Sequence, residues 1–125
     1  MILVDTSIWI DHLRAGDAIL AELLDDGQVL SHPFIIGELA LGNLRRRESV
    51  VADLLELPQA VVARDDEVMH FIQRDGPFGI GIGYVDAHLL AATRLTQGAA
   101  LWTRDKRLLG AAERLSLAMR PGHGP

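Results

Sequence analysis

The chain has 125 residues, of which 49% are hydrophobic and 23% charged, and it contains no cysteine. This length and composition are typical of one globular domain, and the lack of cysteine excludes disulfide bonds, thiolate zinc sites and cysteine nucleophiles. The net charge of −5 argues against a protein that binds nucleic acid through a wholly basic surface. Because no basic segment precedes the first apolar residues, we expect neither a signal peptide nor a membrane span, and we expect a cytoplasmic protein.

We expect residues 1–125 to form a single domain that ends in a flexible tail at 121–125. The chain begins with an apolar run, residues 2–4, which lacks polar alternation and therefore predicts a buried parallel strand. This run ends on Asp5, and Thr6 and Ser7 follow with hydroxyls able to cap the next helix. Asp5 is therefore expected at the carboxyl edge of the sheet, where ligands bind in open α/β folds.

The next part of the chain predicts helix, strand and helix. Residues 17–24 form an amphipathic pattern typical of a helix, and residues 28–30 indicate a short strand. In the helix that follows, positions three and four residues from Glu38 are apolar, including Phe34 and Leu41. We therefore expect Glu38 inside an apolar stripe. Acids are rarely buried without a partner, which makes Glu38 a candidate functional residue.

The middle of the chain offers no catalytic motif. A helix is expected at 48–57, followed by a short strand or an extended connection at 60–63. The acids at 65–67 begin another helix, and we interpret them as structural because the helix macrodipole favours negative charge there. The glycine-rich stretch 76–83 reads G-x-G-x-G, lacks a preceding strand and does not match a dinucleotide-binding motif. It is interpreted as a flexible loop that leads into a helix.

The last third of the chain again joins apolar elements to acids. Residues 84–95 predict the most hydrophobic helix, which belongs in the core, yet Asp86 lies in its first turn. Residues 99–103 predict a second buried strand, and Asp105 follows it directly before a helix at 106–115. This order repeats the arrangement at the start of the chain.

Three further features have simpler interpretations. His32 and His88 are expected to be satisfied or exposed histidines and not metal ligands. Trp9 and Trp102 are expected in the core. Residues 117–119 are a candidate final edge strand.

Four carboxylates stand at a strand end or on an apolar helix, and together they predict a metal site. Several ionised acids close together repel one another, so a cation is their natural counter-ion. Oxygen ligands without cysteine favour Mg²⁺ or Mn²⁺ over zinc or copper. Such a site suits hydrolysis of a phosphodiester by metal-activated water. The four residues are Asp5, Glu38, Asp86 and Asp105.

Taken in order, these motifs resemble those of the PIN-domain family, and specifically the VapC toxins of type II toxin–antitoxin pairs. The matching segments are Asp5-Thr6-Ser7, Glu38, Gly83-Tyr84-Val85-Asp86-Ala87 and Thr103-Arg104-Asp105. The resemblance implies a three-layer α/β/α fold with a central parallel sheet and a Mg²⁺- or Mn²⁺-dependent endoribonuclease activity. It also implies that the four acids are catalytic and bind the metal, and that Thr103 is the catalytic hydroxyl beside Asp105.

The resemblance also implies several partners. They are an RNA substrate, a VapB-type antitoxin that occludes the site, and a second copy of the chain in a homodimer. DNA would be contacted only through the antitoxin. Because aromatic residues make up 5% of the chain, we expect RNA recognition to depend on phosphate contacts and RNA shape. Two basic clusters, at 45–47 and at 104–107, are interpreted as solvated surface.

Two other classes of protein share some of these features. A phosphatase of the haloacid-dehalogenase kind also has an aspartate after its first strand, but it needs a second aspartate where this chain has Ser7. A receiver-like signalling module needs a phosphate-accepting aspartate at the end of a central strand. Asp53 stands near the middle of the chain but lies within a predicted helix.

Overall fold

The computed structural model of the protein describes residues 1–119, so the expected tail at 121–125 lies outside the described residues. Helices separate the strands along this part of the chain, and most of the elements coincide with the predicted ones. Their bounds are β1 Ile2–Val4, α1 Thr6–Ala15, α2 Ala18–Asp25, β2 Val29–Leu30, α3 Pro33–Leu41, α4 Arg47–Glu56, α5 Asp65–Asp75, α6 Tyr84–Leu95, β3 Ala100–Trp102 and α7 Lys106–Arg114.

The three strands form a parallel sheet in the order β2-β1-β3, with the first strand of the chain in the middle. In the register of the two pairs, Ile2 lies opposite both Val29 and Ala100. Leu3 and Leu101 are fully buried, as expected for a parallel sheet covered on both faces. Because the strands are parallel, the residues that follow them emerge at the same edge of the sheet.

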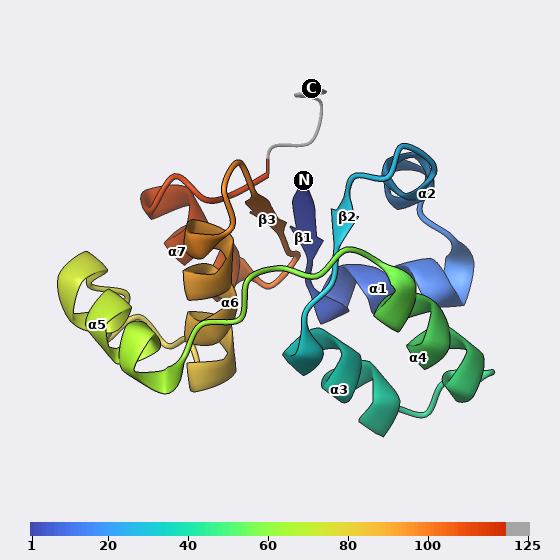
Figure 1. Cartoon of the computed structure of the whole chain (residues 1–125), viewed down its shortest axis with the longest axis horizontal. Coiled ribbons are helices and arrows are strands. Elements are labelled where there is room, and N and C mark those ends of the chain that lie inside the picture. The colour runs from blue at the N-terminus through green and yellow to red at the C-terminus, as the bar shows by residue number, and fades with distance from the viewer. Residues whose placement is uncertain (120–125) are drawn as a thin grey trace.

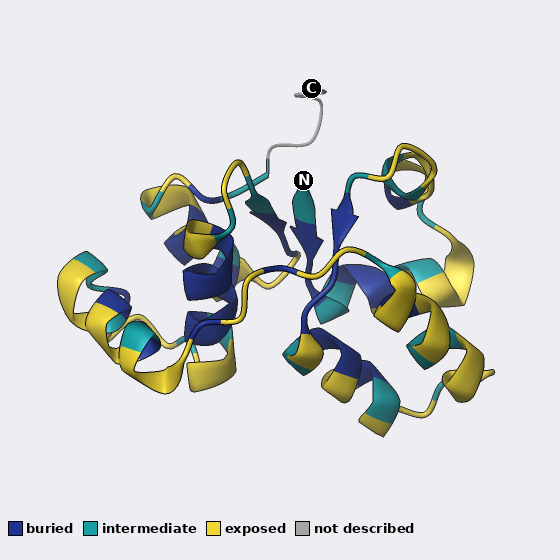
Figure 2. Ribbon diagram, in the orientation of Figure 1, coloured by how far each residue is buried: buried dark blue, intermediate teal, exposed yellow. Residues whose placement is uncertain are grey.

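Helices cover the sheet on two sides. Helices α1 to α4 gather beside β2, and α5 to α7 gather beside β3, with the strands between them (Figure 1). The buried faces of the helices turn toward the sheet and their exposed faces turn outward (Figure 2). Trp9 and Trp102 are each 5% exposed and belong to this core, as predicted. The observed arrangement confirms the expected α/β/α fold with a central parallel sheet.

Three local predictions need correction. Thr6 and Ser7 do not cap α1, because both lie inside its first turn and the N-cap position is Asp5. Residues 60–63 form an extended connection, so the strand alternative is wrong. The segment 117–119 joins the sheet through a single parallel bridge between Leu101 and Ala118 and not as a full strand.

The glycine-rich stretch 76–83 is a loop between α5 and α6, as predicted. Gly81 has a φ of 84°, a left-handed conformation that favours glycine. A Cβ atom at this position would lie 2.8 Å from Nη1 of Arg107, but that flexible side chain can move aside, so the φ angle is the stronger reason for glycine here. Within residues 1–119, no helix combines the length and apolar character needed to cross a membrane.

Candidate active site

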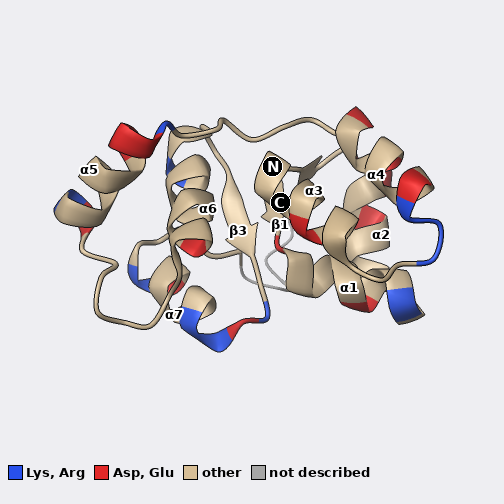
Figure 3. Cartoon of the chain, turned by 90° about the horizontal axis from the view of Figure 1, so that it is seen from below, with Lys and Arg blue, Asp and Glu red and all other residues tan. Residues whose placement is uncertain are grey.

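The four predicted acids gather around the carboxyl edge of the sheet. Asp5 follows β1 and Asp105 follows β3, while Glu38 lies on α3 and Asp86 on α6. Figure 3 looks onto this edge and shows acidic positions after β1, on α3 and on α6 around the strand ends. The carboxylates are near enough for their charges to interact, since the negative charge of Asp5 contributes to the raised pKa of both Glu38 and Asp86.

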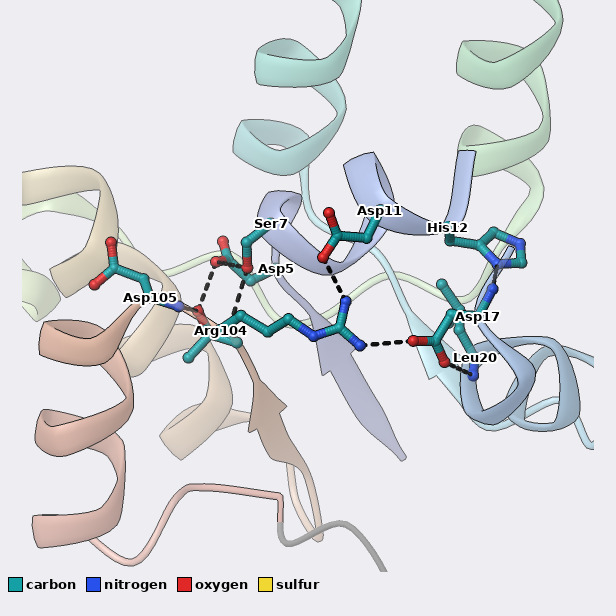
Figure 4. A network of polar contacts seen from close by, with 9 residues as sticks. Asp5, Ser7, Asp11, His12, Asp17, Leu20, Arg104 and Asp105 are labelled. Carbon is teal, nitrogen blue, oxygen red and sulfur yellow. Dashed lines mark hydrogen bonds and ion pairs between the residues drawn. The ribbon is translucent and has the colours of Figure 1, made fainter. Parts of the chain in front are cut away.

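Asp5 is the buried member of the group, with only 8% of its surface exposed. Its Oδ2 atom accepts a hydrogen bond from Thr103 Oγ1 at 2.7 Å and another from Ser7 Oγ at 3.0 Å. Figure 4 shows Ser7 turned toward the carboxylate of Asp5. The two hydroxyls fix the orientation of the carboxylate through one oxygen, which leaves Oδ1 for a different ligand.

The two hydroxyls are themselves held by the turn after β3. The backbone N–H of Arg104 donates to Ser7 Oγ at 3.1 Å, and the backbone N–H of Asp105 donates to Thr103 Oγ1 at 3.1 Å. The position of Asp5 is therefore set by residues almost a hundred positions away in the sequence. This connection explains why a hydroxyl at Thr103 accompanies the acid at Asp105.

Glu38 does not lie inside a buried apolar stripe, so that prediction is wrong. The buried face of α3 carries Ile35 and Leu39, whereas Glu38 is exposed and Leu41 is 91% exposed. Thr6 Oγ1 donates to Glu38 Oε1 at 3.1 Å.

The pKa of Glu38 is nevertheless raised. The main cause is loss of water around the carboxylate, and the negative charges of Asp5 and Asp86 add to it against the effect of the Thr6 hydrogen bond. The side chain therefore favours a positive ligand, although the residue as a whole is exposed.

Asp86 is half-buried in the first turn of α6. Desolvation is the largest cause that raises its pKa, and the charges of Asp5 and Asp105 raise it further. The backbone N–H of Gly83 donates to Asp86 Oδ2 over a long distance of 3.4 Å, which only partly offsets these effects. Asp86 is thus a carboxylate without a strong partner, placed among others of the same charge.

Asp105 has a structural role of its own. It is the N-cap residue of α7, and its Oδ1 accepts hydrogen bonds from the backbone N–H groups of Arg107 and Leu108, both at 3.0 Å. Its Oδ2 atom is left for other contacts. In the described part of the chain, none of the four carboxylates forms an ion pair with a lysine or arginine.

The carboxylates line an open site and do not form a closed cage. Among residues 1–119, no group of three or more acidic or histidine side chains is close enough to enclose one metal ion. This arrangement fits Mg²⁺, which keeps several of its waters and commonly takes only one or two carboxylates from the protein. The hard oxygen donors and the unbalanced negative charge around Asp5 fit the same ion and also Mn²⁺.

The buried histidines have structural contacts. His32 Nδ1 accepts a hydrogen bond from the backbone N–H of Phe34 at 3.0 Å and caps α3, and burial lowers the pKa of His32 to about 4. His88 is 2% exposed and its Nε2 lies 3.2 Å from Asp65 Oδ1. Only one ring nitrogen of each histidine has such a contact. Nε2 of His32 and Nδ1 of His88 are buried without a hydrogen-bond partner among the described residues, so the expectation of satisfied histidines is only half met.

The hydrogen bonds of Asp5 give a first stability prediction. Replacing Thr103 by valine removes a buried donor from Asp5 Oδ2 and should lower the free energy of unfolding by about 1–3 kcal/mol. The matched change Thr6→Val removes an exposed hydrogen bond to Glu38 and should cost clearly less. Urea unfolding of both variants without metal would measure the difference, and equal costs would contradict the assigned role of Thr103.

Comparison with known proteins agrees with the fold. The PIN-domain family model matches residues 2–114 of the chain. The chain is also 50% identical over 119 residues to Ribonuclease VapC32 of Mycobacterium tuberculosis, from both strain CDC 1551 / Oshkosh and strain ATCC 25618 / H37Rv. The alignment covers 95% of this chain and 96% of the relative. These matches displace the phosphatase and receiver alternatives, and the chain belongs to the VapC group of the PIN-domain family.

Proposed function

We propose that the protein is a Mg²⁺- or Mn²⁺-dependent endoribonuclease and the toxin of a type II toxin–antitoxin pair. The observation that carries this proposal is the set of four carboxylates around the sheet edge, two of them with raised pKa values and none with a basic partner in the described residues. The name of the relative from M. tuberculosis, a ribonuclease, supports RNA as the substrate. A cytoplasmic location is part of the same proposal.

Each site residue has a defined part in this proposal. Asp5, with Oδ1 free, Glu38, Asp86 and Asp105 would hold the metal, one or two of them directly and the others through its water molecules. When bound, Mg²⁺ would supply positive charge for the phosphodiester and lower the pKa of a water molecule. Thr103 orients Asp5 through its 2.7 Å hydrogen bond. The raised pKa of Glu38 makes it a better proton acceptor than an ordinary carboxylate. Thr6 donates only to Oε1, so Oε2 would be free to take a proton from the attacking water.

Exposed basic residues flank the acidic centre and favour contact with RNA phosphates. Lys106 and Arg107 begin α7 beside Asp105. The cluster 45–47 lies at the start of α4, which follows α3, the helix of Glu38. Figure 3 shows basic positions at both places, on opposite sides of the strand ends. Such flanks hold a phosphate chain across an acidic site even in a protein with a net charge of −5.

The partners proposed for the protein follow from its family. A VapB-type antitoxin would silence the site, and DNA would be reached only through that antitoxin. A homodimer is also proposed.

Chelation of metal tests the proposed activity directly. The purified protein should cleave single-stranded RNA with Mg²⁺ or Mn²⁺ and should lose cleavage when EDTA is added, because no basic residue among residues 1–119 forms an ion pair with the four acids. Cleavage would be followed on labelled RNA by gel electrophoresis, and added Mg²⁺ in excess of EDTA should restore it. Undiminished cleavage after complete chelation would overturn the proposal.

A further inference from the structure

Arg104 stands in the turn after β3, between two residues of the candidate active site. Its side chain is 42% exposed, but its guanidinium also makes contacts within the protein that the prediction of a solvated residue did not include. Its Nη1 donates to Asp11 Oδ2 at 2.6 Å and its Nη2 donates to Asp17 Oδ2 at 2.6 Å. Figure 4 shows the guanidinium extended between these two carboxylates. Both arms of the arginine are therefore occupied within the protein.

Arg104 and Asp17 each make a further contact besides the one that joins them. The guanidinium carbon of Arg104 lies 5.6 Å from the ring centroid of Trp102, a core residue. Asp17 is the N-cap of α2, with Oδ1 accepting the backbone N–H of Leu20 at 3.0 Å. That hydrogen bond and the Arg104 contact both lower the pKa of Asp17, so the pair stays ionised over a wide pH range.

The contacts of Arg104 join the turn after β3 to helices α1 and α2. Asp11 lies on α1, the helix that begins directly after Asp5, and Asp17 begins the next helix. The backbone N–H of Arg104 donates to Ser7 Oγ at 3.1 Å, and Ser7 in turn donates to Asp5 Oδ2. The side chain thus fastens the turn to α1 and α2, while the backbone of the same residue supports the carboxylate of Asp5.

We infer that Arg104 is a positioning residue that holds the turn 103–105 against α1, so that Ser7 and Thr103 keep Asp5 Oδ1 directed at the metal. This inference rests on the proposed function. Arg104 would act on the metal only through other groups, as residues behind metal ligands generally do. Loss of such support typically costs roughly 10–100-fold in metal affinity or activity. The alternative role for Arg104 is direct contact with an RNA phosphate.

The test compares Arg104→Ala, Arg104→Lys and Asp11→Asn with the wild type in two measurements. The first is the Mg²⁺ concentration at half-maximal rise of the melting temperature, measured without RNA. It should increase at least about tenfold in Arg104→Ala and less in the other two variants, which keep one arm of the contact. The second is steady-state cleavage, in which kcat should fall while KM stays nearly unchanged.

Arg94→Ala is the matched control. Arg94 donates to Asp75 at 3.4 Å and to the carbonyl oxygen of Leu115 at 3.2 Å, and its guanidinium carbon lies 5.9 Å from the ring centroid of Phe71. Its loss removes the same charge and a similar set of contacts on another part of the fold. The melting temperature should fall in this variant, whereas the Mg²⁺ midpoint should match that of the wild type.

Each other outcome has a defined meaning. An unchanged Mg²⁺ midpoint in Arg104→Ala overturns the inference. Three other results together would instead show that Arg104 contacts an RNA phosphate. In Arg104→Ala, KM would rise and the salt dependence of RNA binding would weaken by about one charge, and in Asp11→Asn RNA would bind more tightly. If Arg104→Ala does not fold, Arg104→Lys and Asp11→Asn decide the question. A wild type with neither a Mg²⁺ response nor cleavage would contradict the proposed function itself.

Discussion

Replacing Asp86 by asparagine is expected to reduce RNA cleavage by roughly 10²–10⁴-fold, the usual contribution of a positioned acid or base. Asparagine keeps the shape of the side chain and can still accept the long hydrogen bond from Gly83. It removes one of the negative charges that the proposed metal balances. The loss should therefore appear in kcat, and the response of the melting temperature to Mg²⁺ should be much weaker than in the wild type.

The same variant should not be less stable than the wild type when metal is absent. Desolvation and the charges of Asp5 and Asp105 raise the pKa of Asp86 in the folded protein, so the folded state binds more protons than the unfolded chain just above the ordinary carboxylate pKa. This contribution to stability is complete at low pH and is lost as the pH rises through the folded pKa. At neutral pH the ionised Asp86 destabilises the metal-free fold, and asparagine relieves that cost.

Melting curves with and without Mg²⁺, from about pH 4 to pH 8, would measure both effects. The metal-free wild type should lose more stability with rising pH than Asp86→Asn, because the variant lacks the titrating carboxyl of Asp86 and its raised pKa. Asp53→Asn, an exposed site on α4, is a control of equal charge change and should keep the activity and the Mg²⁺ response of the wild type. A lower metal-free melting temperature for Asp86→Asn, with unchanged cleavage, would assign Asp86 a purely structural role.

An arginine of the cognate antitoxin is expected to abolish cleavage by occupying the acidic site. A guanidinium presents several donors in a planar fork that pairs with two carboxylate oxygens at once. Glu38 and Asp86 suit this pairing, because both have raised pKa values and no basic partner within the residues that the structure describes. At stoichiometric concentration, the antitoxin should leave no measurable cleavage in the presence of Mg²⁺.

Substitution of that arginine by alanine should separate binding from inhibition. The altered antitoxin should still bind, because its remaining contacts are intact, but cleavage should return in part and rise further with added Mg²⁺. An antitoxin with lysine in place of this arginine should inhibit cleavage less than the natural antitoxin, since an ammonium group lacks the planar fork. Binding would be measured by calorimetry and inhibition by RNA cleavage. An antitoxin that binds tightly without inhibiting, in its natural form, would contradict this mechanism.

Local features of the fold could be predicted from the sequence because they depend on neighbouring residues. The apolar runs before Asp5 and before Thr103 indicate buried parallel strands, and the predicted helix at 84–95 coincides with α6. The prediction failed where hydrogen bonding decided the outcome. Thr6 appeared to be a helix cap, but its hydroxyl contacts Glu38, a residue 32 positions away.

The contacts behind the site could not be predicted for the same reason. Arg104 looked like part of a solvated cluster, since nothing in its local sequence indicates its contacts with Asp11 and Asp17, which lie 93 and 87 positions away. Glu38 was expected in a buried stripe because helical spacing gives a residue's neighbours on the helix but not the side of the helix that faces the core. The four acids, in contrast, could be grouped from their places at strand ends and in apolar helix patterns, and the resemblance to a family points to the same residues. Their catalytic role stays a prediction.

The long connection between Asp5 and Thr103, which are 98 positions apart, also has a consequence for the order of events during synthesis. The ribosome produces Asp5 first, but the two hydroxyl-bearing supports and the metal-facing geometry are complete only after β3 has docked beside β1. Such long-range pairing is the slow part of folding, because loop closure must precede the contacts that reward it. A nascent or prematurely ended chain that stops before β3 therefore contains the first acid of the site without the means to orient it, and the toxic activity that we propose would emerge only from a finished domain.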